Sequence, residues 1–263
     1  MVDRMPVTFL AHQAPVFPLK RWLPSLDGVA MVAGSITPDL ARTVPPGYEL
    51  IYDRHPIWWD GHDPVQALTG GLVVGLLLTW SARRLVLPRL AGHLPDLGGF
   101  HLRDLRLVDR TRHRWWMVVV GVVIGTVTHL LLDIPTHTDR DVVVPGTGTH
   151  LMDLAGRPIT VANVLQVLFS VGLSIFAVWE MWDIGRRRLI SRWSGVDPSV
   201  PPTMPHTIAV RCAVVVAAFA SVVVGVTQVH RGPTDGVLTT TVVGWLALCV
   251  IAVFVPKPTL GAG

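Results

Sequence analysis

Five long stretches of the chain are apolar at almost every position and lack the polar face of an amphipathic helix. A helix needs about 20 mostly apolar residues to cross the hydrocarbon core of a bilayer. Tryptophans gather near the ends of these stretches, where indole rings prefer the headgroup level. The pattern predicts an all-α fold, a polytopic membrane helix bundle with about five spanning helices, over residues 65–87, 115–134, 159–182, 207–229 and 236–255.

The first 64 residues contain no stretch of that length. Residues 28–36 are apolar but too few to cross a bilayer, so we expect an interfacial or re-entrant helix there. Prolines divide the rest of this region into short helices. With no repeat and no flexible linker, we expect one membrane domain over residues 1–263, with short helices and loops in 1–64 packed on the spanning helices of 65–255.

Composition supports a membrane protein, because 50% of the residues are apolar and only 15% are charged, against about 25% in soluble domains. This balance excludes a disordered chain, and the two cysteines lie in apolar segments, which excludes a disulfide scaffold. The net charge of +4 comes from arginines concentrated in residues 83–114 and 183–206, here named the Arg-rich loops. The positive-inside rule places both loops in the cytoplasm. A basic nucleic-acid surface is the alternative explanation, but we expect membrane lipid as the partner and no nucleic acid.

Ionisable side chains lie at the C-terminal end of the second predicted span. His129 and Asp133 are four residues apart and share one helix face, which His137 extends unless Pro135 ends the helix first. An ionisable residue inside a membrane helix costs roughly 2.5–3.5 kcal/mol on insertion scales, so this face needs a compensating partner. A divalent metal ion is one, since imidazole and carboxylate are both good ligands. A structural Asp–His pair and a proton relay are the alternatives.

Alternation of the spans brings three further groups to the same side of the membrane: His12, Asp39 and His62. Each also has an ordinary explanation, as a surface histidine, a Pro-Asp turn and an interfacial histidine beside two tryptophans. Weaker candidates on that side are His55, His150, Asp153, Asn163, Gln166 and His230. The Arg-rich loops contain histidines that we expect to be solvated, namely His93, His101, His113 and His206.

Four motifs follow one another in a recognisable order: Met5-Pro-Val-Thr-Phe-Leu-Ala-His12, Gly34-Ser-Ile-Thr-Pro-Asp39, His62, and Thr128-His129-Leu-Leu-Leu-Asp133-Ile-Pro-Thr-His137. In this order the chain resembles a bacterial membrane family catalogued as domain of unknown function 4184, which is related to predicted membrane-bound metal-dependent hydrolases. The resemblance covers roughly residues 5–140, and beyond them it rests mainly on hydropathy. It implies a multi-pass protein of a bacterial cell membrane.

A more distant similarity, to zinc-dependent phospholipase C and the single-strand-specific zinc nucleases, implies a ligand set. Those enzymes order their ligands as His, Asp, His, His-x-x-x-Asp and a further His. The positions carried over are His12, Asp39, His62, His129, Asp133 and His137. The chain has a shorter final spacing and no partner for the last His-x-x-x-Glu pair of those enzymes, because His150 is followed by Asp153 one position early. This departure favours one or two divalent ions, zinc first, over three.

The leading hypothesis is therefore a membrane-embedded metal-dependent hydrolase that acts on a lipid or phosphoester at the outer membrane face. Asp39 is the expected catalytic residue, which bridges ions or orients the attacking water. A transporter or proton-coupled carrier that uses His129 and Asp133 is one alternative, and a non-catalytic protein with a structural metal is the other. A carrier gives no reason for His12, Asp39 and His62 to approach that pair, so their distances separate the hypotheses.

Overall fold

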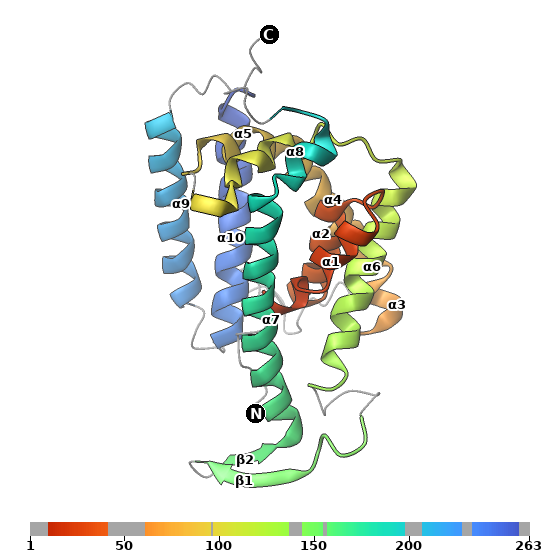
Figure 1. Cartoon of the computed structure of the whole chain (residues 1–263). Coiled ribbons are helices and arrows are strands. Elements are labelled where there is room, and N and C mark those ends of the chain that lie inside the picture. Colours follow the sequence, from red (N-terminus) through yellow and green to blue (C-terminus); the bar gives the residue numbers. More distant parts are fainter. Residues whose placement is uncertain are drawn as a thin grey trace.

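The computed structural model describes residues 10–41, 61–95, 97–136, 144–154, 157–197, 207–227 and 233–257. Within them the chain forms a helix bundle with a small hairpin at one end (Figure 1). The elements are η2 (Ala11–Gln13), α1 (Val16–Trp22), α2 (Gly28–Leu40), α3 (Pro64–Ala67), α4 (Gly70–Ser81), η4 (Ala82–Val86), α5 (Leu87–Leu90), η5 (Ala91–His93), η6 (Gly98–Phe100), η7 (Leu102–Leu107), α6 (Trp115–Asp133), β1 (His150–Leu154), β2 (Arg157–Thr160), α7 (Val161–Arg186), α8 (Leu189–Ser194), α9 (Thr207–Thr227) and α10 (Pro233–Phe254).

Five helical segments of this bundle are long and apolar enough to cross a membrane. They are Pro64–His93, Trp115–Asp133, Val161–Arg186, Thr207–Thr227 and Gly236–Phe254. Each overlaps one predicted span, so the expected membrane helix bundle is confirmed. α9 and α10 pack along each other, and with the end of the first segment they enclose a small apolar cluster of Val86, Leu90, Val210, Ala252 and Val255.

The first of these segments continues past the predicted end at residue 87. Arg83 lies within it on η4, a π-helical turn, where its guanidinium pairs with the Asp27 carboxylate and donates to the Thr111 carbonyl. The charge is satisfied inside the protein, so the helix has no need to end there. The segment reaches His93, whose backbone carbonyl accepts a hydrogen bond from Arg211 at 2.6 Å. His93 is 3% exposed, so our expectation that it is solvated is wrong.

α2 is the short helix that the apolar stretch predicted. Its 13 residues give a length of about 20 Å, too short to cross the bilayer, and it packs between α4 and α6. The Asp27 carboxylate begins the helix by accepting hydrogen bonds from the amides of Val29 and Ala30. Glycines bring it close to α6, because Gly34 faces the backbone of Val122 and Gly125 faces that of Met31.

α1 and α2 form a helical hairpin that starts and finishes at the same end of the bundle. Its turn is held at the opposite end, where Arg21 pairs with Asp183 of α7 at 2.5 Å and Asp27 pairs with Arg83. This hairpin explains how His12 and Asp39 reach one end although 26 residues separate them. It also gives the predicted re-entrant element its form, a pair of short helices within the bundle.

The two Arg-rich loops meet at the turn end of this hairpin, near α5 and α8 in Figure 1. The Asp183 carboxylate accepts hydrogen bonds from Arg186 at 2.8 Å and Arg187 at 3.0 Å. Asp104 of η7 accepts one from Arg188 at 2.8 Å, which joins the first loop to the second. A shared end is what the positive-inside argument requires of both loops. We call it the Arg-rich end, and the opposite end the site end.

Our sequence analysis missed the β-hairpin of β1 and β2, which lies beyond the site end of the bundle (Figure 1). The strands are antiparallel and lead directly into α7. There Thr160 and Asn163 form a capping box, in which each side chain bonds the backbone of the other residue. α7 therefore starts at Val161, and the residues just before it, which we assigned to the third span, belong to β2.

One prediction concerns Lys20, which is buried on α1. Burial lowers its pKa to about 8, against the opposing charge of Asp27 and with a further lowering by Arg83. Between pH 8 and 10.5, the ordinary pKa of a lysine side chain, the unfolded chain holds more protons at Lys20 than the folded chain does. The contribution of Lys20 to folding stability is therefore lowest below pH 8 and rises across this window.

The chain has two lysines, Lys20 and Lys257, which makes the measurement direct. NMR of the full protein in micelles, labelled at lysine side-chain nitrogen, is expected to give a titration near pH 8 that persists in Lys257→Arg. A Lys20 signal that titrates near 10.5 would contradict the prediction.

Candidate metal site

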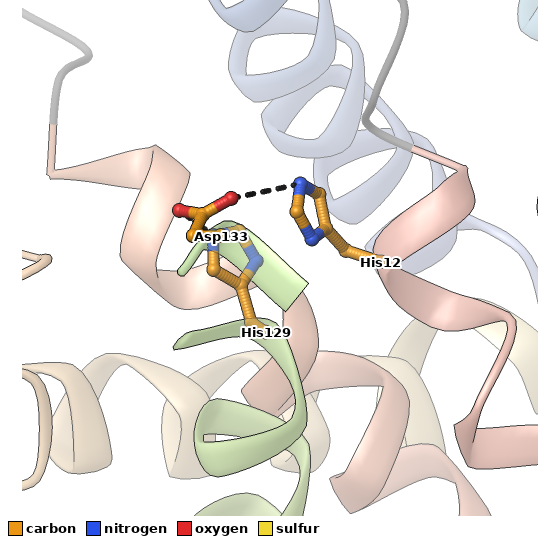
Figure 2. Close-up of side chains that lie close together, drawn as sticks. All are labelled: His12, His129 and Asp133. Atoms are coloured by element: carbon orange, nitrogen blue, oxygen red, sulfur yellow. Dashed lines mark ion pairs between the residues drawn. The ribbon is translucent and has the colours of Figure 1, made fainter. Parts of the chain in front are cut away.

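Five ionisable side chains from four separate segments converge at the site end. His12 lies on η2, Asp39 on the last turn of α2, and His62 just before α3. His129 and Asp133 lie four residues apart on the last turns of α6 and face the same way, as the sequence spacing predicted. Figure 2 shows His12 facing Asp133 and His129 across the gap between η2 and α6.

Four donor atoms lie close together between α2, α3 and α6. Asp133 Oδ2 lies 3.2 Å from His62 Nε2 and 3.5 Å from His129 Nε2. Asp39 Oδ1 lies 3.8 Å from His62 Nε2 and 3.7 Å from His129 Nε2. Two ligands held about 2.1 Å from one tetrahedral ion are about 3.4 Å apart. Each of these four His–Asp separations is close to that value, and Asp39, His62 and His129 each offer one donor atom within 4.8 Å of the other two.

His12 extends this group on its other side. Its Nε2 lies 3.6 Å from Oδ1 of Asp133 (Figure 2), whereas His62 is paired with the other oxygen, Oδ2. The rings of His12 and His129 stack with their centroids 3.9 Å apart. His12, His129 and Asp133 form a second set of donors that lie within 4.8 Å of one another. His129 belongs to both sets, and the two oxygens of Asp133 face His12 and His62, so the arrangement offers donors for one ion or for two.

The orientation of the His129 ring is fixed by α2. Its Nδ1 lies 2.8 Å from the Ser35 carbonyl oxygen, so Nδ1 carries the proton and donates it, which leaves the lone pair on Nε2. The ring is fully buried, and Nε2 makes no hydrogen bond to any described residue. A buried Nε2 close to two carboxylates, on a ring whose Nδ1 is held by a backbone carbonyl, is the arrangement expected of a metal ligand.

A proline inside α2 ties the helix to α6 beside the site. Pro38 has no amide hydrogen, so the Gly34 carbonyl loses its partner in the helix. That carbonyl instead accepts hydrogen bonds from the hydroxyls of Thr37 at 2.9 Å and Thr126 at 3.2 Å. Thr126 belongs to α6, so these bonds link the helix that carries Asp39 to the one that carries His129.

Burial differs across the site and leaves one side accessible. The side chains of His129 and Asp133 are 0% and 4% exposed, whereas those of His62 and Asp39 are 12% and 20% exposed. The more exposed side of the group is therefore the side of His62 and Asp39. Catalytic metal sites keep an open coordination position, whereas structural sites are closed.

The structure thus brings together five of the six residues inferred from the sequence, and His137 lies outside the described residues, as do His55, His206 and His230. Among the weaker candidates, His150 and Asp153 pair with each other at 3.0 Å on exposed β1, and Asn163 caps α7. The Ser35 carbonyl is a functional group that sequence reasoning missed, because any residue type supplies a carbonyl.

Comparison with known families agrees with the motif order. The family model described as Domain of unknown function (DUF4184) matches residues 5–256. The chain belongs to this family. The match runs through α7, α9 and α10, so DUF4184 membership extends well past residues 5–140, where the motifs lie. Comparisons with curated proteins and with solved structures found no match. The DUF4184 description names no activity, so an activity has to be argued from the geometry of the site.

Proposed function

We propose that this chain is a membrane-embedded metal-dependent hydrolase whose site end holds one or two divalent ions, zinc first. The proposed ligands are His12, Asp39, His62, His129 and Asp133, with His137 added from the sequence. The observation that carries the proposal is the four-donor group, in which each measured His–Asp separation lies between 3.2 and 3.8 Å. The carbonyl that orients His129 gives independent support.

The exposure and contacts of Asp39 and Asp133 suggest a different role for each. A bound divalent ion lowers the pKa of a coordinated water to about 7 and draws charge from a phosphoryl or acyl oxygen. Asp39 is the most exposed carboxylate of the group, and we assign it the role of holding and orienting the attacking water on the open side. Asp133 holds the donors together, since its two oxygens face different histidines.

Two features favour this proposal over the alternatives. A proton-coupled carrier built on His129 and Asp133 does not require His12, Asp39 and His62 to lie against that pair, yet all three do. A structural metal is normally enclosed by its ligands, whereas the partial exposure of Asp39 and His62 supports an open position.

Metal analysis and hydrolysis by the purified full chain in detergent test the proposal together. We expect one or two divalent ions per chain, and hydrolysis of p-nitrophenyl phosphate or bis(p-nitrophenyl) phosphate that a chelator abolishes and added zinc restores. A chain that binds no stoichiometric metal would overturn the proposal. Metal without hydrolysis of either compound would overturn the enzymatic half and leave a structural metal.

A further inference from the structure

An apolar cavity of about 770 Å³ runs beside α2, between spanning helices on one side and short elements of the Arg-rich end, such as η7 and α8, on the other. Pockets that bind small molecules usually measure about 300–1,000 Å³. Along α2 the lining extends from Gly28 at the Arg-rich end to Leu40 at the site end, a distance of about 18 Å at 1.5 Å per residue. Leu78 of α4 and Leu246 of α10 contribute to its other walls.

The cavity is lined by one apolar face of α2. Val29, Val32, Ile36 and Leu40 recur every three or four residues, so they form one stripe along the helix. The donor residue Asp39 and the carbonyl of Ser35 belong to the neighbouring face, which packs on α6. Leu40 of the cavity lining and the donor Asp39 are therefore neighbours in the last turn of the same helix, on adjacent faces.

Two cationic groups at the Arg-rich end of the cavity, Lys20 and Arg83, are engaged by the protein itself. Lys20 Nζ donates to the carbonyls of Pro24 and Leu26, both at 2.7 Å. Arg83 pairs with Asp27 and the Thr111 carbonyl. The aliphatic part of Lys20 lies against Gly28. This end suits the terminus of a hydrocarbon chain better than a headgroup, which would compete with these bonds.

We infer that the cavity holds one long hydrocarbon chain of a lipid whose phosphoester headgroup lies at the site end beside Asp39. An apolar cavity of this size does not hold ordered water, which needs polar partners, and hydrocarbon chains are what surrounds these helices in a bilayer. The inference rests on the proposed function for the headgroup, and it assigns that function a substrate class: phosphoester lipids with a long acyl chain.

A pair of neighbouring leucines on α4 gives a matched test. Leu78 lines the cavity, whereas Leu77 is 61% exposed on the outer face of the same helix. The full chain is assayed with palmitoyl lysophosphatidic acid and with glycerol 3-phosphate, which is the same headgroup without the chain. We expect Leu78→Trp to lower turnover of the lipid at least tenfold, with metal content and glycerol 3-phosphate turnover unchanged, and Leu77→Trp to change neither.

Equal lipid turnover in both variants, with metal and glycerol 3-phosphate activity intact, would overturn the inference and leave the proposed function standing. If the wild-type chain hydrolyses neither compound, the proposed function fails on its own. Native mass spectrometry then tests the cavity through the palmitoyl lysophosphatidic acid that the chain retains, which Leu78→Trp should reduce at least tenfold relative to Leu77→Trp. Should Leu78→Trp not fold, Leu78→Ala is expected to shift retention from palmitoyl toward stearoyl chains, and an unchanged preference would refute the cavity as the chain site.

Discussion

Replacement of Asp133 by asparagine is expected to remove the bound metal and to lower metal-dependent hydrolysis at least about 100-fold. Loss of a residue that only supports a ligand already weakens metal binding about 10- to 100-fold, and Asp133 would itself be a ligand. One of its oxygens lies 3.2 Å from His62 Nε2, and the other lies 3.6 Å from His12 Nε2. The change therefore affects both donor groups at once. Metal content per chain and the rate with p-nitrophenyl phosphate are the measurements.

A second His–Asp pair in the chain supplies the control. His150 and Asp153 lie 3.0 Å apart on β1, but they are exposed and away from the donor groups. Asp153→Asn should leave metal content and rate unchanged. If Asp133→Asn keeps its helical circular dichroism and its full metal content, Asp133 is not a ligand, and the proposed site is wrong.

The spanning helices were predictable because the bilayer leaves few choices to an apolar segment of this length. Backbone groups in hydrocarbon must bond within the segment, so hydropathy alone located all five. The exact ends were less predictable, because they depend on partners elsewhere in the chain. In the sequence, Arg83 and Arg84 indicate the start of a loop. The pairing of Arg83 with Asp27 lets the first segment continue as a helix through these residues.

The residues of the candidate site were predictable as a set, but the way they come together was not. The four-residue spacing of His129 and Asp133 placed them on one helix face, and the motif order added the others by resemblance. Nothing in the sequence shows that α1 and α2 turn back within the bundle, which is what carries His12 and Asp39 to the same point. That turn depends on the pairing of Arg21 with Asp183, 162 residues away in the chain.

The candidate site also depends on the contact of α2, which carries Asp39, with α6, which carries His129 and Asp133. The variant Gly125→Ala tests this contact. A Cβ at this position would overlap the Met31 carbonyl oxygen and lie 2.8 Å from the Ser35 amide nitrogen. Both atoms belong to the backbone of α2, so no side-chain rotation relieves the overlap and the helix has to move. Overpacking usually costs about 1–3 kcal/mol, and a backbone clash belongs at or above the top of that range.

The displacement should also reach the metal donors, because Ser35 orients His129 and the same helix carries Asp39. We expect Gly125→Ala to lower unfolding stability in micelles by about 3 kcal/mol or more and to weaken metal retention at least tenfold. Gly172→Ala on α7 is the matched control, since a Cβ there meets open space and alanine is the better helix former by about 0.5–1 kcal/mol. Equal stability and equal metal content in the two variants would show that the close approach of α2 to α6 does not hold the site together.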